Sequence, residues 1–245
     1  MSAITIFCDF DGPIADVSER YYATYRRGLA WVQTQAQAQG DDLTVRHLPK
    51  SQFWIFKQNR VPDRQIAHWS GLEGQYIDGF LGQVSRIVNH STLLDYDQVQ
   101  PQAREGLNIL RQCGVRVVLV TLRPPDQVMR FLDQHDLGWA ISDLYGMPQV
   151  EAAYQNQANH KVERLQAAIA ACNRQGYDLR HAWMVGDTEA DIMAGQTHGI
   201  PTVAVTCGIR SSSYLQSFRP THLVANLWTA CQMLQQRTTL RQQPR

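Results

Sequence analysis

The sequence lacks a long apolar segment and lacks a strong excess of either charge. It contains no stretch of about 18 apolar residues free of charge, so no membrane span is expected. The 23 Lys and Arg residues nearly balance the 22 Asp and Glu residues, which leaves a net charge of +1. This balance gives no support to a nucleic acid or a membrane surface as a partner. With 44% hydrophobic residues, the chain is expected to fold around a core.

Several classes of site are also missing. The five cysteines are scattered and form no CxxC pair, so neither a disulfide framework nor a zinc site is expected. The motifs GxGxxG, GxxxxGK[ST], HExxH and GxSxG do not occur, which excludes the corresponding nucleotide, zinc-protease and serine-hydrolase sites. The N-terminal residues have no basic region and reach Asp9 too early for a signal peptide, so a cytoplasmic protein is expected.

Short apolar runs alternate with amphipathic segments over much of the chain. Continuous apolar runs are typical of parallel strands that are covered on both faces. The runs are residues 3–8, 115–120, 182–185 and 202–205, with weaker candidates at 140–144 and 222–224. Helical stripes such as Leu107 with Leu110, and Leu165 with Ile169, lie between them. The alternation predicts an α/β fold with a Rossmann-like, doubly wound parallel sheet.

Residues 17–100 interrupt this alternation and contain no convincing buried strand. Tyr21, Tyr25, Leu29 and Val32 form one helical stripe there. We therefore predict an α/β core domain of residues 1–16 and 101–236, with an α-helical cap domain of residues 17–100 inserted after the first strand. Residues 237–245 are polar and basic, and are predicted to be a flexible tail.

The first chemical signal is the DFDG segment of residues 9–12, placed at the end of the first strand. Ligands of open α/β sheets bind outside the carboxyl ends of the strands, so Asp9 and Asp11 can serve one site in different roles. Gly12 lets the backbone turn away sharply. A turn or helix-cap cluster is the alternative. A calcium loop is set aside, because the segment follows a strand and lacks a glutamate at the twelfth loop position.

Two further signals lie between the run 115–120 and the run 182–185. Thr121 ends the run 115–120, where a hydroxyl and a backbone N–H could bind a phosphoryl oxygen. Lys161 opens a helix, where a lysine is better explained if an anion binds beside it, because a helix N-terminus is already positive. Taken alone, Thr121 could be structural and Lys161 a solvated lysine.

The fourth signal is the GDTEAD segment of residues 186–191, directly after the run 182–185. Asp187 ends the strand and Asp191 follows one helical turn later, so the two share a face. Asp187 or Thr188 could simply cap the helix. Capping alone would not require the second acid, which favours a shared site. Acids, a threonine and a lysine at one sheet edge predict a magnesium site, because Mg²⁺ prefers a few carboxylates together with water.

In this order the four segments resemble the motifs of the haloacid dehalogenase superfamily, and the likeness extends from residue 4 to about Gly208. The phosphoglycolate-phosphatase-like members carry a helical cap after strand 1. The resemblance implies Mg²⁺ and an aspartyl-phosphate intermediate, with Asp9 as nucleophile and metal ligand and Asp11 as general acid and base. It further implies the following: a metal contact of the Asp11 carbonyl, phosphate contacts of Thr121, Leu122 and Lys161, Asp187 as metal ligand, and Asp191 as an orienter of metal-bound water.

Three positions depart from the pattern of the superfamily. Pro13 replaces the usual Thr, Leu122 stands where Asn is common, and Val162 follows Lys161 in place of Pro. Both carboxylates of the first motif are unaffected by these changes. Any phosphate contact at Leu122 would use its backbone.

The leading hypothesis is a magnesium-dependent phosphatase of a small phosphorylated metabolite, acting as a monomer or homodimer. A phosphomutase on the same scaffold would return the phosphoryl group to a sugar, and a non-catalytic phospho-acceptor or binding module is the alternative outside the enzymes. Substrate specificity is expected to come from the cap, with Lys57 and Arg60 as candidates, and from Arg123 beside the phosphoryl group.

Overall fold

The computed structural model describes residues 4–150 and 152–242, with side chains described as far as Gln236. The chain forms two compact units. The first comprises the described residues of Met1–Asp16, Gln98–Gly208 and Ser212–Arg245, and the second comprises Val17–Asp97 with Ile209–Ser211. Within the described residues, no helix has the length and apolar character needed to cross a membrane.

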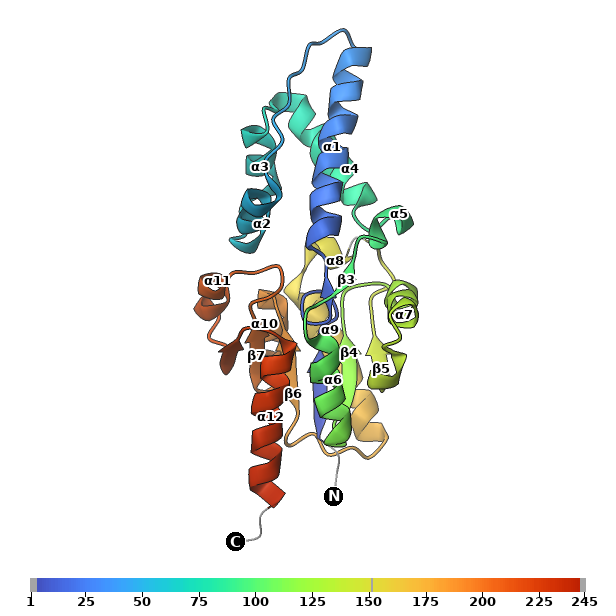
Figure 1. Ribbon diagram of the computed structural model, residues 1–245, viewed down its shortest axis with the longest axis vertical. Helices are drawn as coiled ribbons and strands as arrows, with labels where there is room; N and C mark the ends of the chain where they lie inside the picture. Colours follow the sequence, from blue (N-terminus) through green and yellow to red (C-terminus); the bar gives the residue numbers. More distant parts are fainter. Residues whose placement is uncertain (1–3, 151, 243–245) are drawn as a thin grey trace. The chain divides into compact units, whose positions relative to one another are not determined.

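The first unit is built on a six-stranded parallel sheet in the order β5-β4-β1-β6-β7-β8 (Figure 1). Its strands are β1 (Thr5–Cys8), β4 (Arg116–Val120), β5 (Asp143–Tyr145), β6 (Trp183–Gly186), β7 (Thr202–Val205) and β8 (His222–Val224). The chain fills one side of β1 with β4 and β5, and then crosses to the other side with β6, β7 and β8. This confirms the doubly wound α/β fold and places its topological switch point between β1 and β6.

Helices cover both faces of this sheet, which explains the continuous apolar strands. On one face, Phe7, Val118 and Met184 pack with residues of α9 (Ala158–Arg174) and α10 (Glu189–Thr197). In Figure 1, α6 (Ala103–Gln112) and α12 (Leu227–Gln242) lie in front of the sheet and pack against each other. The unit also contains α7 (Pro125–Gln134), η1 (Gly138–Ala140), α8 (Ala152–Gln155) and α11 (Ser212–Ser217).

The second unit is helical. Its helices are α1 (Ser18–Ala38), α2 (Lys50–Gln58), α3 (Asp63–Trp69), α4 (Gly74–Ile87) and α5 (Ser91–Leu94). Tyr25 stacks on Phe53 with ring centroids 4.8 Å apart and meets Phe80 edge-on, so these rings join α1 to α2 and α4. The buried Arg20 pairs with Asp97 at 2.9 Å, which ties the first helix to the last residue of the inserted segment.

The chain leaves and re-enters the first unit along a short ribbon, in which β2 (Ala15–Asp16) pairs antiparallel with β3 (Gln98–Val99). Residues 98–100, which we predicted to belong to the cap, therefore fall in the first unit, because this pairing holds them there. The segment Ile209–Ser211 falls in the second unit instead of the core. Helix α12 continues to Gln242, so residues 237–242 are helical and not the predicted tail; residues 243–245 lie outside the described residues.

Candidate active site

Three polar side chains follow three neighbouring strands of the sheet. Asp9 comes directly after β1, Thr121 after β4 and Asp187 after β6. The strands end in register, because Cys8 pairs with Leu119 on one side and with Val185 on the other. The N–H of Asp9 donates to the carbonyl of Val185 at 2.8 Å, which fixes the first carboxylate beside β6. The arrangement lies at the switch point, where this fold binds its ligands.

Three carboxylates meet at this edge. Asp9, Asp187 and Asp191 each offer an oxygen within 4.8 Å of the others. All three residues are buried, with exposures of 6%, 1% and 1%. Burial of several acids together is unfavourable unless cations neutralise them. The site must therefore contain positive charge.

Lys161 supplies part of that charge from the first turns of α9. Its ammonium lies 2.7 Å from Asp9 Oδ2 and 2.8 Å from Asp191 Oδ1, and it donates to the carbonyl of Val120 at 3.1 Å. Burial of Lys161 on its own would lower the pKa of the ammonium, but the carboxylates of Asp191 and Asp9 outweigh burial and raise that pKa. Lys161 is thus a permanent cation between two of the acids.

One lysine does not neutralise three acids. The pKa of Asp9 is raised to about 7, first by burial and then by the charge of Asp191, against the opposing effect of Lys161. A divalent cation would supply the missing positive charge and would favour the ionised form of Asp9. Oxygen ligands of this kind suit Mg²⁺, which uses few carboxylates and keeps several waters.

The backbone around Asp187 leaves space for the carboxylate alone. A Cβ on Gly12 would lie 2.1 Å from Asp187 Cγ, and a Cβ on Gly208 would lie 2.0 Å from Asp187 Oδ2. Gly12 also has a φ of +93°, which side-chain-bearing residues rarely adopt. Two glycines from separate loops therefore form a cradle that admits the Asp187 carboxylate next to Asp9. With the three acids, this cradle fits a small oxygen-liganded cation.

Asp191 also has a structural role that our prediction excluded. Thr188 is the N-cap of α10, and both its N–H and its hydroxyl donate to Asp191 Oδ2, at 3.1 and 2.8 Å. The second acid is thus part of a capping box, and our argument that capping would not require it was wrong. Its other oxygen still reaches Lys161. Asp191 joins the helix start to the charged cluster.

Asp11 points to a different partner from the other acids. Its Oδ1 accepts a hydrogen bond of 2.8 Å from Arg123, whose side chain is 1% exposed while that of Asp11 is 21% exposed. Arg123 also lies over the ring of Phe10. The structure places Arg123 against Asp11, and the expected contact of Arg123 with substrate stays a prediction. The contact of the Asp11 carbonyl with a metal remains a prediction.

The loop after β4 presents Thr121 and Leu122. The N–H of Thr121 donates to the carbonyl of Tyr145, so this N–H is not the phosphate donor that we predicted. The Thr121 hydroxyl accepts from the N–H of Arg123 at 3.2 Å and can still donate its own proton. The side chain of Leu122 packs with Met147. Only the backbone of Leu122 could therefore contact a bound anion.

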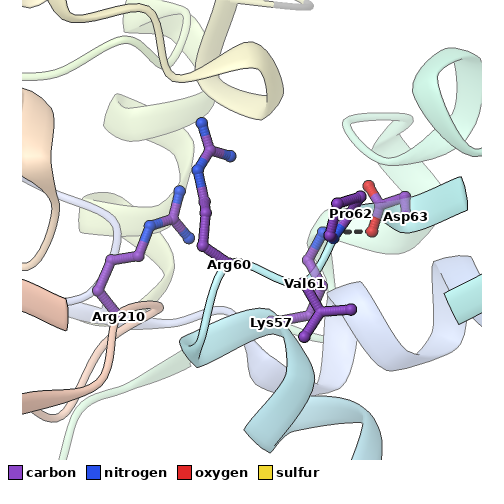
Figure 2. A pocket seen from close by; sticks show the side chains of 6 residues that line it. All are labelled: Lys57, Arg60, Val61, Pro62, Asp63 and Arg210. Carbon is purple, nitrogen blue, oxygen red and sulfur yellow. Dashed lines mark hydrogen bonds and ion pairs between the residues drawn. The ribbon is translucent and has the colours of Figure 1, made fainter. Parts of the chain in front are cut away.

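Lys57 and Arg60 lie in the second unit and line one pocket there, as Figure 2 shows. Arg210 lines the same pocket and was missed by the sequence analysis. It follows the core strand β7, and nothing in its local sequence links it to α2. The two glycines of the cradle were missed in that role for the same reason, since the contact joins distant loops.

Comparisons with known proteins find hydrolases and phosphatases among the similar chains. The family model described as HAD-hydrolase-like matches residues 162–230. A phosphoglycolate phosphatase of Haemophilus influenzae is 24% identical over 52% of this chain, and the match spans about half (54%) of that relative. Pyrophosphatase PpaX of Bacillus velezensis is 24% identical over 91% of this chain and 92% of its own. A HAD-superfamily hydrolase structure from Geobacter sulfurreducens superimposes with a TM-score of 0.62 and 19% identity, covering 95% and 96% of the two chains.

Proposed function

We propose that this chain is a magnesium-dependent phosphatase of the haloacid dehalogenase superfamily, which hydrolyses a small phosphomonoester through an aspartyl-phosphate intermediate. The observation that carries this proposal is the buried cluster of Asp9, Asp187 and Asp191 around Lys161 at the switch point of the sheet. The capping box accounts for Asp191, but burial of Asp9 and Asp187 beside it is unfavourable to folding, because like charges at this spacing repel. A metal ion and a phosphoryl group explain it.

In the first step, a carboxylate oxygen of Asp9 attacks phosphorus. The bond from phosphorus to the substrate oxygen breaks, and Asp11 donates a proton to the leaving alcohol. Lys161 neutralises charge on the phosphoryl oxygens, with the Thr121 hydroxyl and the Leu122 backbone as further donors. The Arg123 contact holds the Asp11 carboxyl in position during this transfer.

In the second step, water attacks the phosphorus of the aspartyl phosphate. Asp11, now ionised, takes a proton from that water, and the bond from phosphorus to Asp9 breaks. Inorganic phosphate leaves and the Asp9 carboxylate is restored. The two steps balance, since the proton given to the alcohol is recovered from water.

Asp9, Asp187 and the Asp11 carbonyl would hold the magnesium ion, with Asp191 orienting its water ligands. When bound, Mg²⁺ would neutralise phosphoryl charge and lower the repulsion that Asp9 meets as it attacks. The Asp187 cradle supports this assignment, because its two glycines leave room for the carboxylate and little else.

The names of the two relatives support a small substrate. Phosphoglycolate and pyrophosphate are compact molecules that carry a phosphoryl group. We propose the same size class for this chain, in preference to phosphoproteins.

The test is phosphate release from a panel of phosphomonoesters by EDTA-treated protein, with and without added Mg²⁺. We expect activity only with Mg²⁺, and inhibition by Ca²⁺, which takes more ligands at longer distances. Asp9→Asn should retain less than about a hundredth of kcat, because a neutral amide cannot replace the nucleophile. Full activity in EDTA would contradict the metal assignment. Isomerised sugar phosphate without phosphate release would show a phosphomutase instead.

A further inference from the structure

A pocket within the helical unit is separate in sequence from the four motifs. Its volume is about 350 Å³. It is lined by Lys57, Arg60, Val61, Pro62, Asp63 and Arg210. Three of these six residues are cations and one is an acid, so the lining carries a net positive charge of two. We call it the basic pocket.

The one carboxylate of the lining, that of Asp63, forms an ion pair with Lys57. Lys57 Nζ lies 2.7 Å from Asp63 Oδ1, and both side chains are mostly buried. Figure 2 shows Lys57 extending to Asp63, while the guanidinium groups of Arg60 and Arg210 turn away from that pair. The pKa of Lys57 is lowered, mainly by burial, and the charges of Arg210 and Arg60 act in the same direction against Asp63. The charges of the two guanidinium groups therefore act on the ammonium of Lys57, which lines the same pocket.

One backbone and one side-chain hydrogen bond of Ser211 hold the segment of Arg210 beside the end of α2, close to Arg60. The N–H of Ser211 donates to the carbonyl of Gln58 at 2.8 Å, and the Ser211 hydroxyl donates to Asn59 Oδ1 at 2.9 Å. These contacts hold Arg210, 3% exposed, at the end of α2. Arg60 has a φ of +61°, a conformation that costs free energy in any residue but glycine.

We propose that the basic pocket binds a small oxyanion, a phosphate or carboxylate group, held by Arg60 and Arg210. Guanidinium groups present a planar pair of donors that match both groups. Two sources can supply this chemistry. One is a second anionic group on the substrate, and this source rests on the proposed function. The other is a free anion that binds the helical unit irrespective of catalysis.

The test is calorimetric titration of inorganic phosphate into EDTA-treated protein. Without metal, the carboxylates around Asp9 repel an anion, so binding reports the basic pocket. Arg60→Gly should weaken phosphate binding at least about tenfold, as expected for loss of a charge-assisted pair. Its backbone conformation favours Gly, so the fold should persist. Arg60→Lys, which keeps the charge but loses the planar donors, should bind with intermediate affinity.

Arg219→Gly is the matched control, because Arg219 is an exposed arginine with a φ of +54° in the first unit. It should leave phosphate binding unchanged. Equal affinity of wild type, Arg60→Gly and Arg219→Gly would overturn the proposal, and so would absence of phosphate binding to wild type.

Kinetics separate the two sources. If the pocket takes the second group of a substrate, Arg60→Gly should lower kcat/KM for phosphoglycolate about tenfold more than for p-nitrophenyl phosphate, which has no second anion. If the anion is free, phosphate affinity falls while the ratio of the two kcat/KM values stays constant. A wild-type protein that binds phosphate through Arg60 but hydrolyses no phosphomonoester would refute the proposed function and leave the basic pocket intact.

Discussion

Arg123 donates a hydrogen bond of 2.8 Å to Asp11, although 112 positions separate the two residues. The contact joins the loop after β4 to the loop after β1. In the proposed mechanism Asp11 acts first as an acid and then as a base, so its orientation matters in both steps. The N–H of Arg123 is itself fixed by the Thr121 hydroxyl, which makes Arg123 a positioning residue for Asp11.

Arg123→Gln should therefore slow the proton transfers selectively. We expect kcat for an alkyl phosphate, whose leaving group needs a proton, to fall about tenfold or more, within the range that general acid catalysis supplies. The effect on p-nitrophenyl phosphate should be smaller in the first step, because nitrophenolate leaves without protonation. Arg123→Lys should recover part of the loss. An equal loss of kcat/KM, which reports the first step, on both substrates would indicate a purely structural role.

Lys161 separates two buried carboxylates, and its removal should be costly to folding. Lys161→Met should lower the free energy of unfolding in EDTA by about 3–5 kcal/mol, the typical cost of leaving a buried charge uncompensated. Mg²⁺ should restore more stability to the variant than to wild type, since the cation replaces the lost positive charge. Urea denaturation with and without Mg²⁺ measures both effects. An unchanged stability in EDTA would show that Lys161 is not paired as described.

Gly208→Ala tests the cradle around Asp187. The added Cβ would lie 2.0 Å from Asp187 Oδ2 and must displace that carboxylate. We expect weaker Mg²⁺ binding, measured by titration calorimetry, and a matching loss of activity at low Mg²⁺. Gly138→Ala is the control, because a Cβ there would meet nothing within 4 Å. An unchanged Mg²⁺ affinity of Gly208→Ala would show that Asp187 is not a ligand of the metal ion.

The sheet could be predicted because burial on both faces leaves a local signature. The runs that became β1, β4, β6 and β7 are continuous and largely apolar, and β1, β4 and β6 each end where a polar site residue begins. The order of motifs along a doubly wound sheet then places their ends together. Our prediction ended helix α12 too early. Its last residues are mostly polar, so they show no apolar periodicity from which a helix could be predicted.

Contacts between distant loops could not be predicted in the same way. The pairing of Arg123 with Asp11 depends on how the loops after β1 and β4 turn, and a lone arginine carries no sign of this. Arg210 reaches the helical unit through hydrogen bonds of Ser211, 152 positions from Asn59. The double role of Asp191, in a helix cap and beside Lys161, was hidden because each role alone accounts for an acid at that position.

The central claim is that Asp9 carries the phosphoryl group, and Asp11→Asn with p-nitrophenyl phosphate tests it most directly. Nitrophenolate needs no proton to leave, so the first step should proceed, while the second step lacks its base and the phosphoenzyme should accumulate. We predict a burst of nitrophenolate close to one equivalent per protein, with phosphate mapped by mass spectrometry to Asp9. Turnover without a burst, or covalent phosphate on another residue, would contradict the account.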